Sequence, residues 1–107
     1  MEILDEEMDI IINIIKNHTK KCEVLIFGSR LKGNNHPFSD LDLAFICKKG
    51  LEFKKKISLQ IAFDDSDLPY RVDVVDYNSI SKEFKEIIDS ENEKIWGDGV
   101  WILSGNW

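Results

Sequence analysis

Residues 23–42 read EVLIFGSRLKGNNHPFSDLD, and this stretch decides the fold. The run from Glu23 to Phe27 is β-branched and apolar, which predicts a strand that ends at Gly28. The residues after it are rich in turn formers and open with a short helix that Ser29 could cap. From residue 40 to 47, apolar side chains alternate with Asp40, Asp42 and Ala44, and this period of two predicts a second strand.

Four further elements flank this unit. Apolar residues recur at helical spacing over about residues 3–18, and again from Phe53 through Ile57 to Ile61, so both segments are predicted helices. Residues 64–69 form a loop, residues 70–76 a third strand, and the spacing from Ile80 to Ile88 a final helix. The order predicts an α/β fold, a small mixed β-sheet flanked by helices.

The chain holds one predicted domain, residues 1–95, followed by a tryptophan-rich tail, residues 96–107. The tail carries Trp96, Trp101 and Trp107 and fits neither the helix nor the strand period. A docking segment for a partner and an altered reading frame are both open as explanations of it.

Composition excludes several classes of protein. The 107 residues carry a formal net charge of −6, which argues against direct nucleic-acid binding because phosphate backbones are held by a basic face. No apolar stretch approaches the length of a membrane span or a secretory signal. Two cysteines, Cys22 and Cys47, are too few for a disulfide scaffold and suit core positions on strands, so we expect a cytoplasmic protein.

Three carboxylates form the first half of a candidate site. Asp40 and Asp42, two residues apart on one strand, project from the same face, and their charges repel unless a cation lies between them. Asp73 joins them if the third strand neighbours the second, whereas Asp76 points to the other face. Carboxylate oxygens suit Mg²⁺ or Mn²⁺, so these three residues are the predicted catalytic and metal-binding groups.

A possible phosphate cradle forms the second half. Gly28 permits a tight turn, and Ser29 offers a hydroxyl and backbone N–H groups at a helix start. Arg30 and Lys32 add two cations that could neutralise a departing pyrophosphate. A phosphate cradle joined to a metal-binding pair is what phosphoryl or nucleotidyl transfer requires.

These residues resemble the minimal nucleotidyltransferases of the DNA polymerase β superfamily, in particular the MNT antitoxin of HEPN/MNT toxin–antitoxin pairs. The likeness rests on GSRLKG at residues 28–33, SDLDL at 39–43 and RVDVV at 71–75, and it runs from about residue 3 to 95. The resemblance implies that Gly28 and Ser29 hold the triphosphate of ATP. It further implies that Asp40 and Asp42 ligate two Mg²⁺ ions, with Asp73 completing the catalytic metal site.

The same resemblance implies transfer of AMP from ATP to a tyrosine of a HEPN RNase toxin, with release of pyrophosphate and a stable complex between the two proteins. Two alternatives are open. The chain could neutralise its partner by binding alone, with nucleotide bound but not turned over. It could also act on a small molecule, as antibiotic-modifying nucleotidyltransferases do, with a second chain supplying the acceptor pocket.

Overall fold

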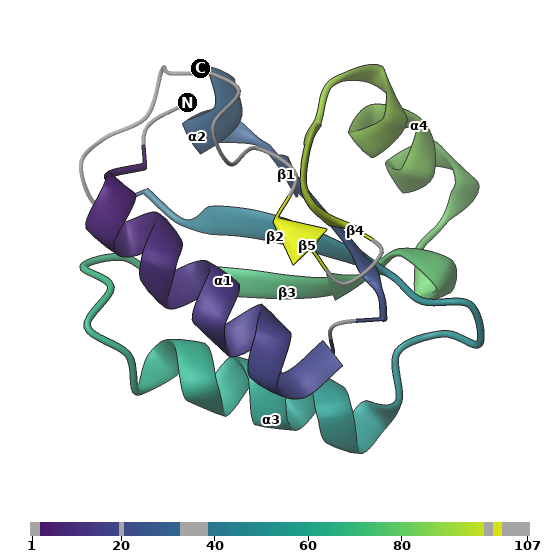
Figure 1. The fold of residues 1–107 in the computed structure, drawn as a ribbon. Helices are drawn as coiled ribbons and strands as arrows, with labels where there is room; N and C mark the ends of the chain where they lie inside the picture. The colour runs from purple at the N-terminus through teal and green to yellow at the C-terminus, as the bar shows by residue number, and fades with distance from the viewer. Residues whose placement is uncertain (1–2, 20, 33–38, 98–99, 102–107) are drawn as a thin grey trace.

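The computed structural model describes residues 3–19, 21–32, 39–97 and 100–101 (Figure 1). Along the chain, its elements are α1 (Asp5–Thr19), β1 (Glu23–Phe27), α2 (Ser29–Lys32), β2 (Leu41–Ile46), α3 (Phe53–Asp64), β3 (Val72–Asp76), a 3₁₀ turn (Tyr77–Ser79), α4 (Lys82–Ser90), β4 (Glu93–Gly97) and β5 (Val100–Trp101).

One mixed sheet of five strands organises the molecule, in the order β3-β2-β1-β4-β5. β2 and β3 run parallel, whereas β1 is antiparallel to both of its neighbours, β2 and β4. The end of β1 therefore lies beside the beginnings of β2 and β3, at one end of the strands; this end of the sheet is called the edge where β2 and β3 begin. The predicted mixed sheet with flanking helices is confirmed.

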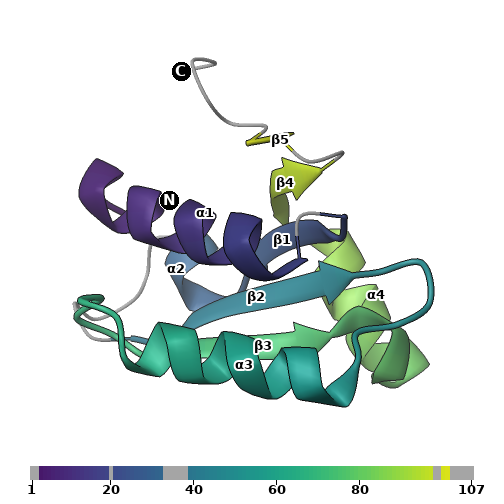
Figure 2. The same cartoon turned by 60° about the horizontal axis from the view of Figure 1, so that its bottom comes forward.

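Helices cover both faces of this sheet (Figures 1 and 2). α1 and α3 lie side by side on one face, where Ile11 and Ile15 of α1 and Leu59 of α3 are fully buried in the main core. α4 lies on the other face and buries Ile88 against Leu25, Phe27 and Ala44 in a smaller cluster. The alternation of side chains along β1 and β2 supplies one apolar row to each cluster.

The helix α3 presents a different face from the one its sequence pattern suggests. Phe53, Ile57 and Ile61, the residues whose spacing predicts the helix, are exposed, while Leu59 and Phe63 are buried. Both sides of this helix are thus apolar, and the sheet covers only one of them.

Gln60 of α3 fastens the helix to the edge strand β3. Its side-chain Nε2 donates to the carbonyl oxygen of Val72 at 2.7 Å, and its Oε1 accepts from the backbone N–H of Val74 at 3.4 Å. One amide group therefore bonds two backbone groups that a further strand would otherwise pair with.

The sheet also contains two strands that the sequence pattern did not predict, β4 and β5. β4 pairs with β1 and buries Ile95 and Trp96, so the predicted domain boundary at residue 95 falls inside a strand. β5 pairs with β4 through Trp96 and Gly97. The remainder of the predicted tail, residues 98–99 and 102–107, lies outside the described residues.

Cys22 and Cys47 are both buried, as predicted, and form a disulfide, which was not predicted. Cys22 directly precedes β1 and Cys47 directly follows β2, so the disulfide lies at the end of the strands opposite to the carboxylates. Since Glu23 pairs with Ile46, the register brings the two cysteines face to face, with 4.5 Å between their Cα atoms. Among the described residues, no helix has the length and apolar character that crossing a bilayer requires.

Candidate functional site

The turn after β1 brings the backbone of Gly28 against the Asp42 side chain. Gly28 adopts a φ of +86°, a left-handed conformation that residues with a side chain rarely adopt. A Cβ atom at this position would also collide with the Asp42 carboxylate oxygen Oδ2. Glycine is thus required twice here, for the turn itself and for the space that the carboxylate occupies.

The strand register brings the predicted carboxylates together. Asp42 of β2 lies opposite Phe27 of β1 and beside Asp73 of β3. The backbone N–H of Leu41 donates to the carbonyl oxygen of Arg71 at 2.8 Å, which fixes the beginnings of the two parallel strands at one level. Asp40 lies exposed just before β2, so all three predicted acids are at the same edge of the sheet.

Asp42 has the most perturbed carboxyl group at this edge. Burial of its side chain, followed by repulsion from Asp73 and then from Asp40, raises the pKa of Asp42 from 3.8 to about 6. Both causes penalise the charged form, so a cation placed between these carboxylates would relieve the repulsion. Partial compensation already exists at Asp73, whose Oδ1 lies 3.2 Å from the Nε of Arg71 in a solvent-exposed ion pair.

The donor set fits a hard divalent cation, since every candidate ligand is a carboxylate oxygen. Within the described residues, no group of three carboxylate, imidazole or thiolate side chains is yet arranged closely enough to hold a metal ion. Asp42 and Asp73 are adjacent in register, while Asp40 stands before the strand begins.

Arg30 is placed differently from the other predicted phosphate ligands. It is buried, its Nε donates to the carbonyl oxygen of Ser39 at 2.9 Å, and its guanidinium carbon lies 3.7 Å from the centre of the Tyr70 ring. Ser39 immediately precedes Asp40. The described contacts of Arg30 therefore hold the segment that carries the carboxylates.

Tyr70 and Glu7 extend this arrangement, although no sequence pattern predicts either of them as a site residue. The Tyr70 hydroxyl donates to the Glu7 carboxylate at 3.0 Å. Burial, and next the neighbouring negative charge of Glu7, raise the pKa of Tyr70, so the hydroxyl stays protonated and keeps donating. Only the fold shows this contact, because 63 residues separate the two partners along the chain.

Ser29 and Lys32 lie at the two ends of α2 and are both exposed. Lys32 Nζ lies 3.7 Å from the carboxylate of Glu91, in an ion pair whose partners are both more than half exposed. Such a pair contributes little to stability and leaves the ammonium group able to change partners.

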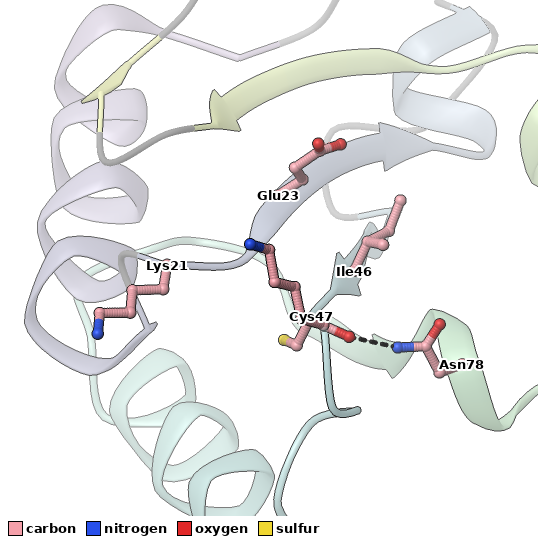
Figure 3. A pocket seen from close by; sticks show the side chains of 6 residues that line it. Lys21, Glu23, Ile46, Cys47 and Asn78 are labelled. Carbon is pink, nitrogen blue, oxygen red and sulfur yellow. Dashed lines mark hydrogen bonds between the residues drawn. The ribbon is translucent and has the colours of Figure 1, made fainter.

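A pocket of about 280 Å³ lies at the opposite edge of the sheet, next to the disulfide (Figure 3). Lys21, Glu23, Ile46, Cys47, Lys48 and Asn78 line it, and Asn78 Nδ2 donates to the Cys47 carbonyl oxygen at 2.6 Å. It contains none of the residues predicted for catalysis or nucleotide binding.

Comparison with known proteins identifies relatives of this fold. The family model described as polymerase beta, nucleotidyltransferase matches residues 9–98. A curated relative, the probable protein adenylyltransferase MntA of Haemophilus influenzae, is 42% identical over 88 residues, which cover 82% of this chain and 77% of the relative.

Two solved structures of toxin–antitoxin proteins are also similar in fold. A toxin–antitoxin crystal structure with AMP-PNP superposes with a TM-score of 0.73 at 27% identity, covering 88% of this chain and 74% of that chain. A mutant of the toxin–antitoxin MntA–HpeT superposes with a TM-score of 0.71, also at 27% identity, and covers 88% of this chain and 73% of that one.

Proposed function

We propose, from the premise that this chain belongs to the polymerase beta nucleotidyltransferase family, that it is an antitoxin which transfers AMP from ATP to a tyrosine of a HEPN-domain RNase toxin. The observation that carries the proposal is the pairing of Asp42 with Asp73 beside the Gly28 turn. The relative named as a probable protein adenylyltransferase supports the reaction, and the toxin–antitoxin structure with AMP-PNP supports the nucleotide and the partner.

In the proposed reaction, the tyrosine oxygen attacks the α-phosphorus of ATP. The bond from that phosphorus to the oxygen bridging the α- and β-phosphates breaks, and pyrophosphate leaves. Asp73 takes the phenolic proton as the new oxygen–phosphorus bond forms. The toxin supplies the acceptor in a stable complex with this chain.

Divalent cations are general in nucleotidyltransferases, and we propose two Mg²⁺ ions here, with Mn²⁺ as a substitute. Asp40, Asp42 and Asp73 would hold them, and they would offset the negative charge of the triphosphate. The raised pKa of Asp42 supports this assignment, because a cation would stabilise the ionised form that the fold disfavours.

The remaining predicted residues take separate roles. The Gly28 turn and the Ser29 hydroxyl would contact the triphosphate, and Lys32 would exchange Glu91 for a phosphate. For Arg30, nucleotide binding stays a prediction, since its described contacts are to Ser39 and Tyr70. We propose the cytoplasm as the compartment because ATP is available there. The Cys22–Cys47 disulfide does not support this part of the proposal, since cytosolic thiols are mostly kept reduced.

The test uses ATP labelled at the α-phosphate, Mg²⁺ and the purified toxin partner on a denaturing gel. We expect a labelled toxin band with the wild-type chain and a loss of at least about 100-fold with Asp42→Asn. Asp67→Asn, an exposed acid in the loop after α3, serves as the matched control and should label normally. Equal labelling by Asp42→Asn would refute the site, and toxin neutralised without any label would favour binding alone.

A further inference from the structure

The outer face of α3 carries an apolar row that nothing described in the chain covers. Phe53, Ile57 and Ile61 are 76%, 43% and 54% exposed. Their spacing of four residues places them along one side of the helix. The buried residues Leu59 and Phe63 already supply the contact with the sheet. The outer row is therefore not needed for the fold of one chain.

The charges of α3 run against its own backbone dipole. Lys54, Lys55 and Lys56 occupy the first turn, whereas Asp64 and Asp65 stand at the end. A helix favours negative charge at its beginning and positive charge at its end, so this distribution is unfavourable within one chain. Among the described residues, none of these three lysines forms an ion pair.

We propose that this face of α3 binds the same face of a second copy of the chain, with the two helices antiparallel about a twofold axis. An antiparallel alignment that places Ile57 of one copy against Ile61 of the other also brings Lys54 to the level of Asp64. Lysines of one helix then lie near aspartates of the other, and the two helix dipoles run in opposite directions, which is favourable in both respects. A parallel alignment would place lysine against lysine, and aspartate against aspartate.

The proposed contact leaves the carboxylates accessible. Asp40, Asp42 and Asp73 lie where β2 and β3 begin, whereas the apolar row consists of exposed residues of α3, a helix that covers one face of the sheet. Figure 2 shows α3 on that face. The dimer is independent of the proposed transfer reaction and of its partner. Three apolar side chains from each copy make a small interface, so dissociation in the micromolar range is expected.

Sedimentation equilibrium of the full chain, from about 10 μM to about 1 mM, tests the proposal directly. We expect a mass that rises with concentration from monomer to dimer. Ile57→Asp should weaken association at least 10-fold, while Ile87→Asp, on α4 and 64% exposed, should leave it unchanged. Far-UV circular dichroism checks that both variants fold.

A charge exchange distinguishes the antiparallel arrangement from general stickiness. Lys54→Glu should weaken the dimer, and the double variant Lys54→Glu/Asp64→Lys should restore it. A chain that is monomeric at every concentration, or equal effects of Ile57→Asp and Ile87→Asp, would overturn the proposal. A monomeric chain whose binding to the toxin is lost in Ile57→Asp would overturn it as well and assign the face to the toxin. Because the measured quantity is mass, an inactive chain can still confirm the dimer.

Discussion

Asp42, whose carboxyl group is the most perturbed of the proposed site, makes the stability of the chain depend on pH. The folded chain holds the Asp42 proton more tightly than the unfolded chain does, because burial and two neighbouring acids raise the pKa to about 6. The free energy of unfolding therefore falls as pH rises from about 4 to about 6. With allowance for solvent screening, the expected loss is roughly 1 kcal/mol.

Asp42→Asn should remove this pH-dependent loss of stability, because an amide carries no charge at either pH. In EDTA, we expect the thermal midpoint of the variant to exceed that of the wild type at pH 7 and to match it near pH 4. Thermal unfolding across this pH range measures the difference, with Asp67→Asn as the control. A variant whose midpoint follows the wild type at every pH would contradict the assigned origin of the shift.

The sequence predicts some residues of the site better than others. Strand alternation accounts for Asp42, and Asp73 follows once β3 is placed beside β2. Asp40 was expected on the same strand face, but β2 begins at Leu41, so alternation does not set its position. The position of Arg30 could not be predicted, because it depends on Tyr70, which the fold brings from forty residues further along the chain. Spacing indicates which residues share a strand face, but it does not indicate which distant ring lies beneath a guanidinium group.

At the scale of elements, the strands with a clear sequence period were predicted, whereas β4 and β5, which lack one, were missed. β4 has two exposed charged residues before its buried Ile95 and Trp96, so neither alternation nor a continuous apolar run marks it. Its place is set by pairing with β1, some seventy residues earlier. The orientation of α3 was ambiguous for a related reason, since apolar residues lie on both of its sides.

Gln60 tests how α3 is held. Gln60→Ala leaves the Val72 carbonyl and the Val74 N–H without the side-chain amide that bonds them. We expect a loss of about 1–2 kcal/mol in the free energy of unfolding, measured by urea denaturation. Ser58→Ala, exposed on the same helix, should change little, and an equal loss in both variants would argue against the edge contact.

At the scale of the whole molecule, the disulfide closes a long loop. Cys22 and Cys47 are 25 residues apart, so their bond restricts the unfolded chain and contributes about 3 kcal/mol. We expect dithiothreitol to lower the thermal midpoint of the oxidised protein by more than about 10 °C. The Cys22→Ala/Cys47→Ala variant should not respond to the reductant. If dithiothreitol lowered the thermal midpoint of that variant equally, the effect could not be assigned to the disulfide.

The Gln60 contact also bears on which associations the edge strand β3 can form. A strand edge presents the same repeating donors and acceptors to any polypeptide, so recognition through it discriminates poorly between sequences. The Gln60 amide already bonds the Val72 carbonyl and the Val74 N–H, so a polypeptide added along β3 would have to displace it or forgo those two backbone contacts. Side-chain contacts differ from one protein to the next, and a single substitution can turn a matched pair into a mismatched one. If the proposed toxin binds along β3, the match between the two proteins would rest mainly on side chains.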